Sequence, residues 1–156
     1  MHSTDPADSR RKSRMRVSMY QPARLYGFAE GEDGKVFFHL ECFHPGPSLH
    51  DGSDPPPPIV GEYVVVEWDP ASESDEKAPR AFRVERTDPP IHLEGVVETF
   101  NEHKGWGFCK GNDGLSYHLH RSEVLEGRLP LPGRKLVFWK GWRRGRPRAC
   151  YVQILD

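Results

Sequence analysis

The chain contains the same order of short segments twice, and this duplication constrains its fold more than any other feature of the sequence. The offset between corresponding positions falls from 81 residues at His39 and His120 to 68 residues at Val84 and Val152, because the first copy has longer loops. Other corresponding positions are Tyr26–Phe28 with Trp106–Phe108, Gly61 with Gly133, and Pro79–Ala81 with Pro147–Ala149. A chain of 156 residues divided in this way holds two small domains, each near the size at which stability is marginal.

Each copy contains five short runs of β-branched and aromatic residues, separated by turn residues, and neither copy shows a long helical pattern. These runs predict strands. In the first copy they are Val17–Tyr20, Tyr26–Glu30, Val36–His39, Tyr63–Trp68 and Arg80–Glu85; in the second they are Gly95–Phe100, Gly105–Lys110, Ser116–His120, Lys135–Lys140 and Pro147–Ile154.

Five short strands with long third and fourth connections are typical of a small Greek-key barrel of the oligonucleotide-binding (OB) type. We therefore predict an all-β chain with two five-stranded antiparallel OB-type barrels in tandem, at residues 15–88 and 89–156, joined by the stiff linker Asp88–Pro90. Residues 1–14 lack apolar periodicity and predict a disordered basic arm. The proline-rich stretch 45–58 predicts an exposed loop with polyproline character.

The net charge of −1 hides an asymmetry along the chain. Residues 15–88 carry seven basic and 14 acidic groups, whereas residues 89–156 carry 11 basic and seven acidic groups. A polyanion should therefore prefer the second copy. No apolar run is long enough for a membrane span, the N-terminus does not resemble a secretory signal, and the three widely spaced cysteines indicate reduced thiols in a cytoplasmic protein.

Strand alternation assigns the faces of each copy. In the second copy it places Val97, Cys109, Tyr117 and Leu119 inside, and Trp106, Phe108, His118 and His120 outside. In the first copy it places Val17, Ala29, Val36 and Phe38 inside, and Tyr26, Phe28, Phe37 and His39 outside. A register shift of one residue would exchange the two sets. Flat side chains gathered on an outer sheet face predict a platform on which nucleic-acid bases stack.

Basic residues accompany the outer aromatic side chains. The densest cluster is the stretch 140–148, which we expect to be a loop between the last two strands, with Trp142 as a further stacking surface among phosphate-binding arginines. Other interpretations stay open: rings packed against a partner, a solvated loop, or zinc held by the histidines and Cys109. The last lacks the usual ligand spacing.

These residues resemble the cold-shock domain family. The second copy matches its pattern at Gly95, Val97, Phe100, Asn101, Lys104–Phe108, His120, Ser122, Arg146–Ala149 and Val152; the first matches at Val17, Tyr20, Tyr26–Phe28, Val36–His39, Pro79, Ala81 and Val84. The resemblance implies barrels that bind single-stranded RNA or DNA through two aromatic motifs and act as RNA chaperones or transcript regulators.

The chain departs from the family pattern at its binding face. The Lys-Trp pair of the family's first strand is Glu98-Thr99 in one copy and Ser18-Met19 in the other. His118 stands where the family has a central Phe, and Arg24-Leu25 where Lys-Gly is usual. Each copy has thus lost one stacking ring and one cation.

We therefore predict a non-enzymatic protein that binds single-stranded RNA or DNA and needs no cofactor or metal, because no phosphate loop, nucleophile elbow or spaced carboxylate pair is visible. Two alternatives are a protein-interaction module, whose partner would bind through the first domain or the proline-rich loop, and an RNA-binding barrel of the ribosomal S1 type. The predicted binding residues are Arg24, Tyr26, Phe28, Phe37, His39, Arg80, Lys104, Trp106, Phe108, His118, His120, Arg121, Trp142, Arg143, Arg144, Arg146 and Arg148.

Overall fold

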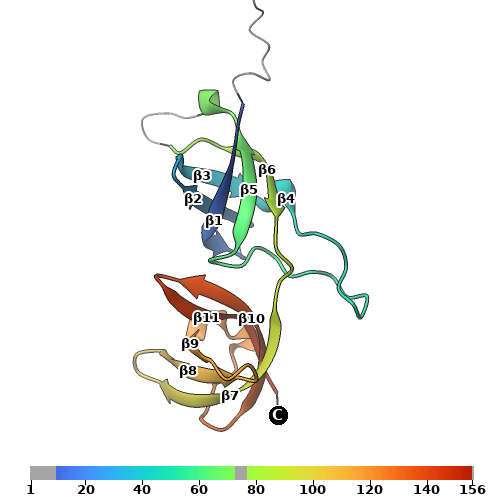
Figure 1. The fold of residues 1–156 in the computed structure, drawn as a ribbon. Coiled ribbons are helices and arrows are strands. Elements are labelled where there is room, and N and C mark those ends of the chain that lie inside the picture. Colours follow the sequence, from blue (N-terminus) through green and yellow to red (C-terminus); the bar gives the residue numbers. More distant parts are fainter. Residues whose placement is uncertain (1–9, 73–76, 156) are drawn as a thin grey trace, which may run out of the picture. The chain divides into compact units, whose positions relative to one another are not determined.

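The computed structural model describes residues 10–72 and 77–155. Within these ranges the regular structure consists of β-strands and single-turn 3₁₀ helices, so the chain is all-β as predicted (Figure 1). The chain divides after Pro89 into two compact units. No helix in the described ranges is long and apolar enough to cross a membrane.

The first unit is a curled sheet. Its strands are β1 (Arg11–Gln21), β2 (Tyr26–Gly31), β3 (Gly34–His39), β4 (Phe43–His44), β5 (Tyr63–Trp68) and β6 (Ala81–Arg86), in the order β3-β2-β1-β5-β6-β4. A single parallel bridge between Phe37 and Arg80 joins β3 to the chain entering β6, where the Phe37 N–H donates to the Pro79 carbonyl at 2.9 Å. That bridge brings the two ends of the sheet together.

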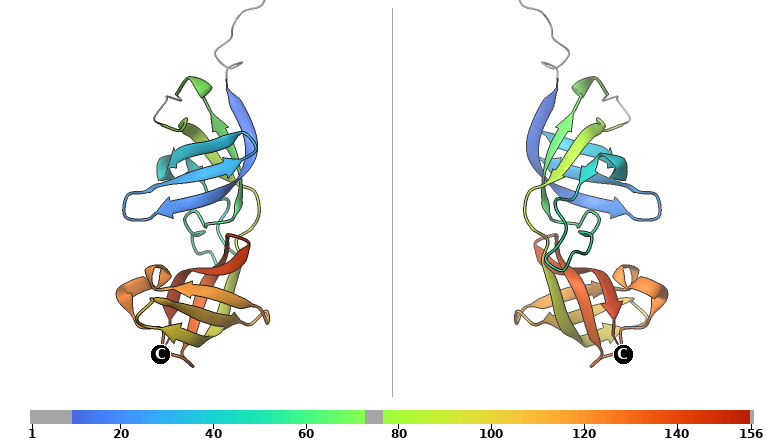
Figure 2. Two further views of the ribbon diagram at one scale, coloured as in Figure 1. Left: turned by 90° about the vertical axis from the view of Figure 1, so that its left-hand side faces the viewer. Right: turned by 90° about the vertical axis from the view of Figure 1, so that its right-hand side faces the viewer.

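The second unit is a closed barrel of β7 (His92–Asn101), β8 (Trp106–Gly111), β9 (Ser116–His120), β10 (Lys135–Arg143) and β11 (Arg146–Ile154). Its order is β10-β11-β9-β8-β7, and β7 pairs with β10 to complete the ring. Figure 2 shows the strands curling around the barrel from two opposite sides. Counted from the first strand, the order 1-2-3-5-4-1 is the topology of an OB-type barrel.

The two units share this topology, and their parallel β-bridges also correspond. The parallel pair Phe37–Arg80 corresponds to His118–Arg148, and Phe43–Val84 corresponds to Val124–Val152. The first strand is bulged at the same place in each unit, between Val17 and Met19 and between Val97 and Thr99. The duplication read from the sequence is therefore a duplication of structure.

Each unit has its own core, and the cores confirm the predicted faces. The side chains of Val97, Cys109, Tyr117 and Leu119 are at most 2% exposed, and those of Val17, Ala29, Val36 and Phe38 at most 1%. Tyr117, the largest fully buried side chain among the described residues, keeps its hydroxyl paired by donating to the Asp113 carboxylate at 2.5 Å. The outer aromatic residues therefore stand on the opposite, solvent-facing side of the same strands.

Three expectations about the chain trace need correction. The basic arm was expected to reach residue 14, but β1 begins at Arg11, because residues 11–16 pair with β5; residues 1–9 lie outside the described ranges. The barrels are not wholly antiparallel, since the third and fifth strands pair in parallel. The stretch 140–148 is not a loop: β10 and β11 extend into a hairpin that turns at Arg144 and Gly145, with φ of 52° and 76°.

The proline-rich loop is less exposed than predicted. Pro56 and Pro58 are buried, and the guanidinium of Arg86 donates to the carbonyls of Pro45, Pro56 and Pro57 at 2.9–3.2 Å. Arg86 also donates to both carboxylate oxygens of Glu62, at 2.6 and 2.9 Å. The loop is thus tied to the end of β6 by one buried side chain.

Candidate nucleic-acid interface

The second unit carries four flat side chains in adjacent positions on its outer face. Trp106 and Phe108 come from β8, and His118 and His120 come from β9. The strand register sets Trp106 opposite His120 and Phe108 opposite His118. Trp106 lies within 25° of parallel to His118 at a centroid distance of 5.6 Å, whereas Phe108 stands edge-on to both, at 5.9 and 5.8 Å. His118 and His120 are 6.4 Å apart and also within 25° of parallel. We call these four residues the second platform.

The first unit repeats the arrangement with Tyr26, Phe28, Phe37 and His39, which we call the first platform. Tyr26 lies within 27° of parallel to Phe37 at 5.4 Å. Phe28 is edge-on to Tyr26 at 6.1 Å and inclined by 72° to Phe37 at 5.6 Å. The three corresponding ring spacings, 6.1 and 5.9 Å, 5.4 and 5.6 Å, and 5.6 and 5.8 Å, each differ by 0.2 Å between the two platforms. The structure therefore brings the predicted aromatic residues together twice, in one geometry.

The glycine between each pair of rings allows β2 and β8 to lie close against the bulged first strands. A Cβ atom added at Gly107 would overlap the Thr99 carbonyl oxygen and lie 2.6 Å from the Phe100 Cα. At Gly27 the corresponding obstacle is the Met19 carbonyl oxygen. Contacts this short with backbone atoms leave no room for a side chain, so the ring-Gly-ring motif is a packing requirement as well as a surface feature.

His39 and His120 each cap a 3₁₀ helix while standing in a platform. The Nδ1 atom of His120 accepts from the Ser122 backbone N–H at 3.1 Å, and that of His39 accepts from the Glu41 backbone N–H at 3.1 Å. An acceptor Nδ1 places the proton of a neutral imidazole on Nε2. The caps fix the orientation of both rings.

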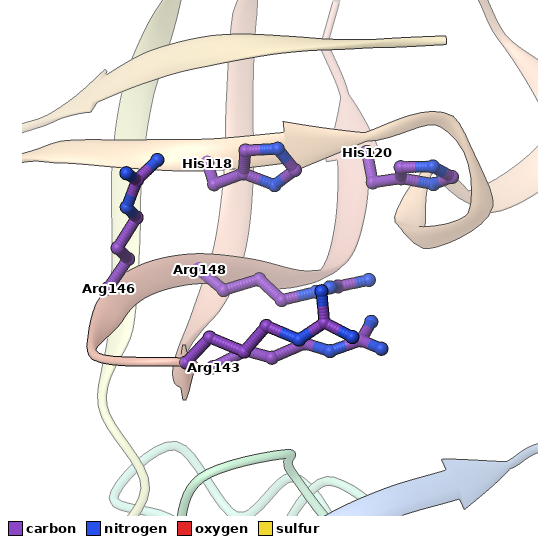
Figure 3. Close-up of a pocket in the computed structure, with 6 residues that line it drawn as sticks. His118, His120, Arg143, Arg146 and Arg148 are labelled. Carbon is purple, nitrogen blue, oxygen red and sulfur yellow. The ribbon is translucent and has the colours of Figure 1, made fainter.

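A basic pocket adjoins the second platform. It is lined by His118, His120, Arg143, Arg144, Arg146 and Arg148 and has a volume of about 450 Å³. Figure 3 shows the two histidine rings projecting from β9 while the long arginine side chains extend from the β10–β11 hairpin. The parallel pairing of Arg148 with His118 sets these two elements side by side. The two histidines belong to both the platform and the pocket.

Burial and arginine charge shift the titration of the pocket. The pKa of His118 is lowered by burial and then by Arg148, and the pKa of His120 is lowered by the same two causes in the same order. Burial, with Arg148 and Arg144, also lowers the pKa of Arg143. The pocket therefore favours neutral imidazoles and presents an excess of positive charge to an incoming anion.

In the first platform, cations lie over the faces of the rings, whereas the arginines of the second unit line a pocket beside its rings. The Lys35 ammonium lies over the Phe28 ring at 4.3 Å, and the Arg80 guanidinium lies over the Phe37 ring at 5.4 Å. A second pocket, of about 580 Å³, is lined by Phe28, Phe37, Ser72, Lys77, Ala78 and Arg80. Sequence reasoning missed Lys35, although its alternation with Phe37 and His39 on β3 already placed all three on one face.

Four predicted residues lie outside the two platforms and do not line the pockets beside them. Lys104 is exposed in the β7–β8 turn, and Arg24 is exposed in the β1–β2 turn. Arg121 donates from its guanidinium to the Glu102 carbonyl at 2.5 Å, so it braces the β7–β8 turn. Trp142 pairs with Pro147 and alternates with Arg143, which places it on the face of the hairpin opposite the arginines. Trp142 therefore does not stand among those arginines, and its part in binding stays a prediction.

The described residues hold no group of three or more metal-ligating side chains. Cys109, which a zinc interpretation would need, is fully buried, and burial raises the pKa of its thiol to about 12. A buried thiol held in its protonated form is a packing group.

Comparisons with known proteins identify no family for this chain. No protein-family model matches the chain, and no curated protein matches it. Among solved structures, the chain is similar to drosophila Unr CSD456, with 17% sequence identity and a TM-score of 0.40. The match covers 94% of this chain and 62% of the Unr chain. The fold class consequently rests on the strand order and pairing described above.

Proposed function

We propose that this protein binds single-stranded RNA or DNA through its two platforms, without covalent chemistry, and acts as an RNA chaperone or a regulator of transcripts or transcription. The observation that carries the proposal is that His118 and His120 are shared by the second platform and the arginine pocket. A strand whose base stacks on these rings has its phosphates within reach of guanidinium groups.

The energetics of such a site suit a strand of any sequence. Stacking of a base on an aromatic ring is worth about 1–3 kcal/mol and depends weakly on base identity, because every base has a π-face. Arginine contacts to phosphate supply the salt-dependent part of the affinity. Because Arg143, Arg144 and Arg146 are exposed side chains of the same hairpin, they can follow a backbone that continues past the pocket.

The first unit contributes a second site in this proposal. Tyr26, Phe28, Phe37 and His39 present the same ring geometry, with Lys35 and Arg80 beside it as the cations for phosphate. Exposed Lys104 and Arg24 lie in corresponding turns at the ends of the ring strands, where they would contact phosphates further along the strand.

The test is binding of labelled single-stranded oligonucleotides over a salt series. We expect the logarithm of the association constant to fall linearly with the logarithm of salt concentration, and we expect the double variant Trp106→Ala/Phe108→Ala to lose at least about tenfold in affinity, as loss of about 1–3 kcal/mol per stacked base requires. Leu115→Ala, which removes an exposed apolar side chain from the β8–β9 turn of the same unit, is the matched control. A flat salt dependence, or equal binding by the double variant, would refute the proposal.

A second candidate concerns the first unit alone. Residues 1–89, which make up this unit, carry 11 basic and 16 acidic groups, a net charge of −5 that disfavours phosphate, and the faces of Phe28 and Phe37 already hold cations of the same unit. In this second candidate the first platform binds a protein partner in place of the strand. Phe28→Ala/Phe37→Ala distinguishes the two candidates: it weakens oligonucleotide binding if the first unit binds the strand and leaves it unchanged if the unit binds protein.

A further inference from the structure

The arginine pocket holds more positive charge than one internal phosphodiester needs. Four of its six lining residues are arginines. Among the described residues, the carboxylate that pairs with one of these arginines is that of Glu123, which accepts from Arg148 at 3.2 Å. With neutral histidines, these five charged groups leave a net charge of +3. An internal phosphodiester carries a single negative charge, so a diester alone leaves most of this charge unmatched.

Arg148 shows that the excess charge is directed into the pocket. Its side chain is only 9% exposed, and its Nε atom is buried without a hydrogen-bond partner among the described residues. A buried, unpaired donor of a charged group costs free energy that the fold does not recover elsewhere. An acceptor supplied by a ligand would satisfy it.

The other three arginines of the pocket come from one hairpin turn. Arg143 and Arg146 form a directly opposed cross-strand pair, and like charges in that position are destabilising. The left-handed conformation of Arg144 at the turn, with φ of 52°, adds backbone strain that glycine or asparagine would lessen. The hairpin is therefore built at a cost in stability that a multiply charged anion would offset.

We propose that this pocket binds the terminal phosphate of the nucleic-acid strand, so that the protein prefers phosphorylated ends. This inference rests on the proposed function, since the terminal nucleotide would stack its base on His118 and His120. A terminal phosphate monoester carries about −1.5 to −2 charges at neutral pH and offers three acceptor oxygens, which suits several guanidinium donors at once. The volume of about 450 Å³ lies in the range of pockets that hold small ligands.

The chemistry of the pocket suits a monoester at either end of the strand, so the experiment compares both. The full-length protein is titrated with one single-stranded sequence of about ten nucleotides, within the site size of such barrels, bearing hydroxyls at both ends, a 5′-phosphate, or a 3′-phosphate. We expect one phosphorylated form to bind at least about tenfold more tightly than the hydroxyl form, the gain given by one or two charge-assisted contacts. The preferred form identifies which end of the strand enters the pocket.

The double variant Arg144→Gln/Arg146→Gln tests whether the pocket is responsible, because both side chains are exposed and their replacement spares the core. We expect it to bind all three oligonucleotides alike. Arg134→Gln/Lys135→Gln removes the same charge from the same unit, at the opposite end of β10 from the hairpin turn and outside the pocket, and should keep the preference. Equal binding of all three oligonucleotides by the natural protein, or a preference that survives in the arginine variant, overturns the inference and leaves the proposed function standing. Failure to bind any oligonucleotide refutes both.

Discussion

His120 and His39 each use one ring for two purposes, as a helix cap through Nδ1 and as a flat surface in a platform. A cap holds the ring at one orientation, so a base meets a surface that has already lost its rotational freedom. His118 stands where the first platform has Phe37, and this difference makes the second platform sensitive to pH, because imidazole titrates near neutral pH. Single residues therefore decide both how rigid the platforms are and how they respond to acid.

The lowered pKa of His118 and His120 predicts that acid destabilises the second unit. The native state binds fewer protons at these positions than the unfolded state, whose histidines titrate near 6.5. The stability that these two neutral histidines contribute is therefore fully present above about pH 6.5. It is lost as the pH falls from there through their lower native pKa. Calorimetric unfolding from pH 7.5 downward should show this loss, and it should be smaller in His118→Gln. His50→Gln, at an exposed position in the other unit, should retain the pH dependence of the natural protein.

Gly107→Ala should destabilise the second unit by about 1–3 kcal/mol or more, the range for overpacking against atoms that cannot move aside. The added Cβ would overlap the Thr99 carbonyl and the Phe100 backbone. Gly114→Ala is the control. Gly114 has a φ of 85°, and a Cβ added there would meet no heavy atom within 4 Å. This variant should be destabilised only by its left-handed backbone conformation, by about 1 kcal/mol. If thermal unfolding shows the two variants to be equally stable, the close approach of β8 to β7 is not what requires this glycine.

At the scale of elements, Arg86 organises the longest loop of the first unit. Its side chain is 2% exposed, and its five hydrogen bonds bind three proline carbonyls and both oxygens of Glu62. Arg86→Leu removes the donors that Arg86 supplies to those carbonyls and to the Glu62 carboxylate, which keeps the Ile59 backbone N–H at 2.7 Å. We therefore expect a loss of about 3–5 kcal/mol in stability and faster proteolysis within residues 45–58.

Arg83→Ala is the matched control for that change. Arg83 also lies on β6 and pairs with Glu67 and Glu85, but its side chain is 41% exposed, and solvent screening limits its contribution to about 1 kcal/mol or less. Comparable loss of stability in both variants would show that the loop does not depend on the buried pair.

The sequence predicts the elements well where the signal is local. Alternation between rings and small apolar residues assigned the faces of β2, β3, β8 and β9 correctly, because one face of each strand packs into a core. The hydrogen bonds that hold the proline-rich loop include one from Arg86 to Pro56, 30 positions away, and no local pattern encodes such a contact. The position of Trp142 could have been predicted from the sequence. A two-residue Arg-Gly turn extends both flanking strands, and alternation along the extended strand then places Trp142 and Arg143 on opposite faces.

At the scale of the whole molecule, the two units keep one architecture and one ring geometry but differ in charge. The second unit places its arginines in a pocket beside the rings, whereas the first places Lys35 and Arg80 over its ring faces, in a net acidic sequence. Duplication has thus preserved the surface on which bases would stack and varied the groups that would meet phosphate. Salt dependence separates these two contributions, because it reports phosphate contacts and is insensitive to stacking.

Two double variants, each removing two positive charges, show which unit contacts the strand. Each phosphate neutralised on a single strand contributes about 0.7 to the slope of log affinity against log salt, so Arg144→Gln/Arg146→Gln should reduce the slope by about 1.4. Lys35→Gln/Arg80→Gln should reduce it by a similar amount if the first unit lies on the same strand, which is the outcome we expect from its matching rings. An unchanged slope in the second variant would assign the first unit to a protein partner and leave strand binding to the second unit alone.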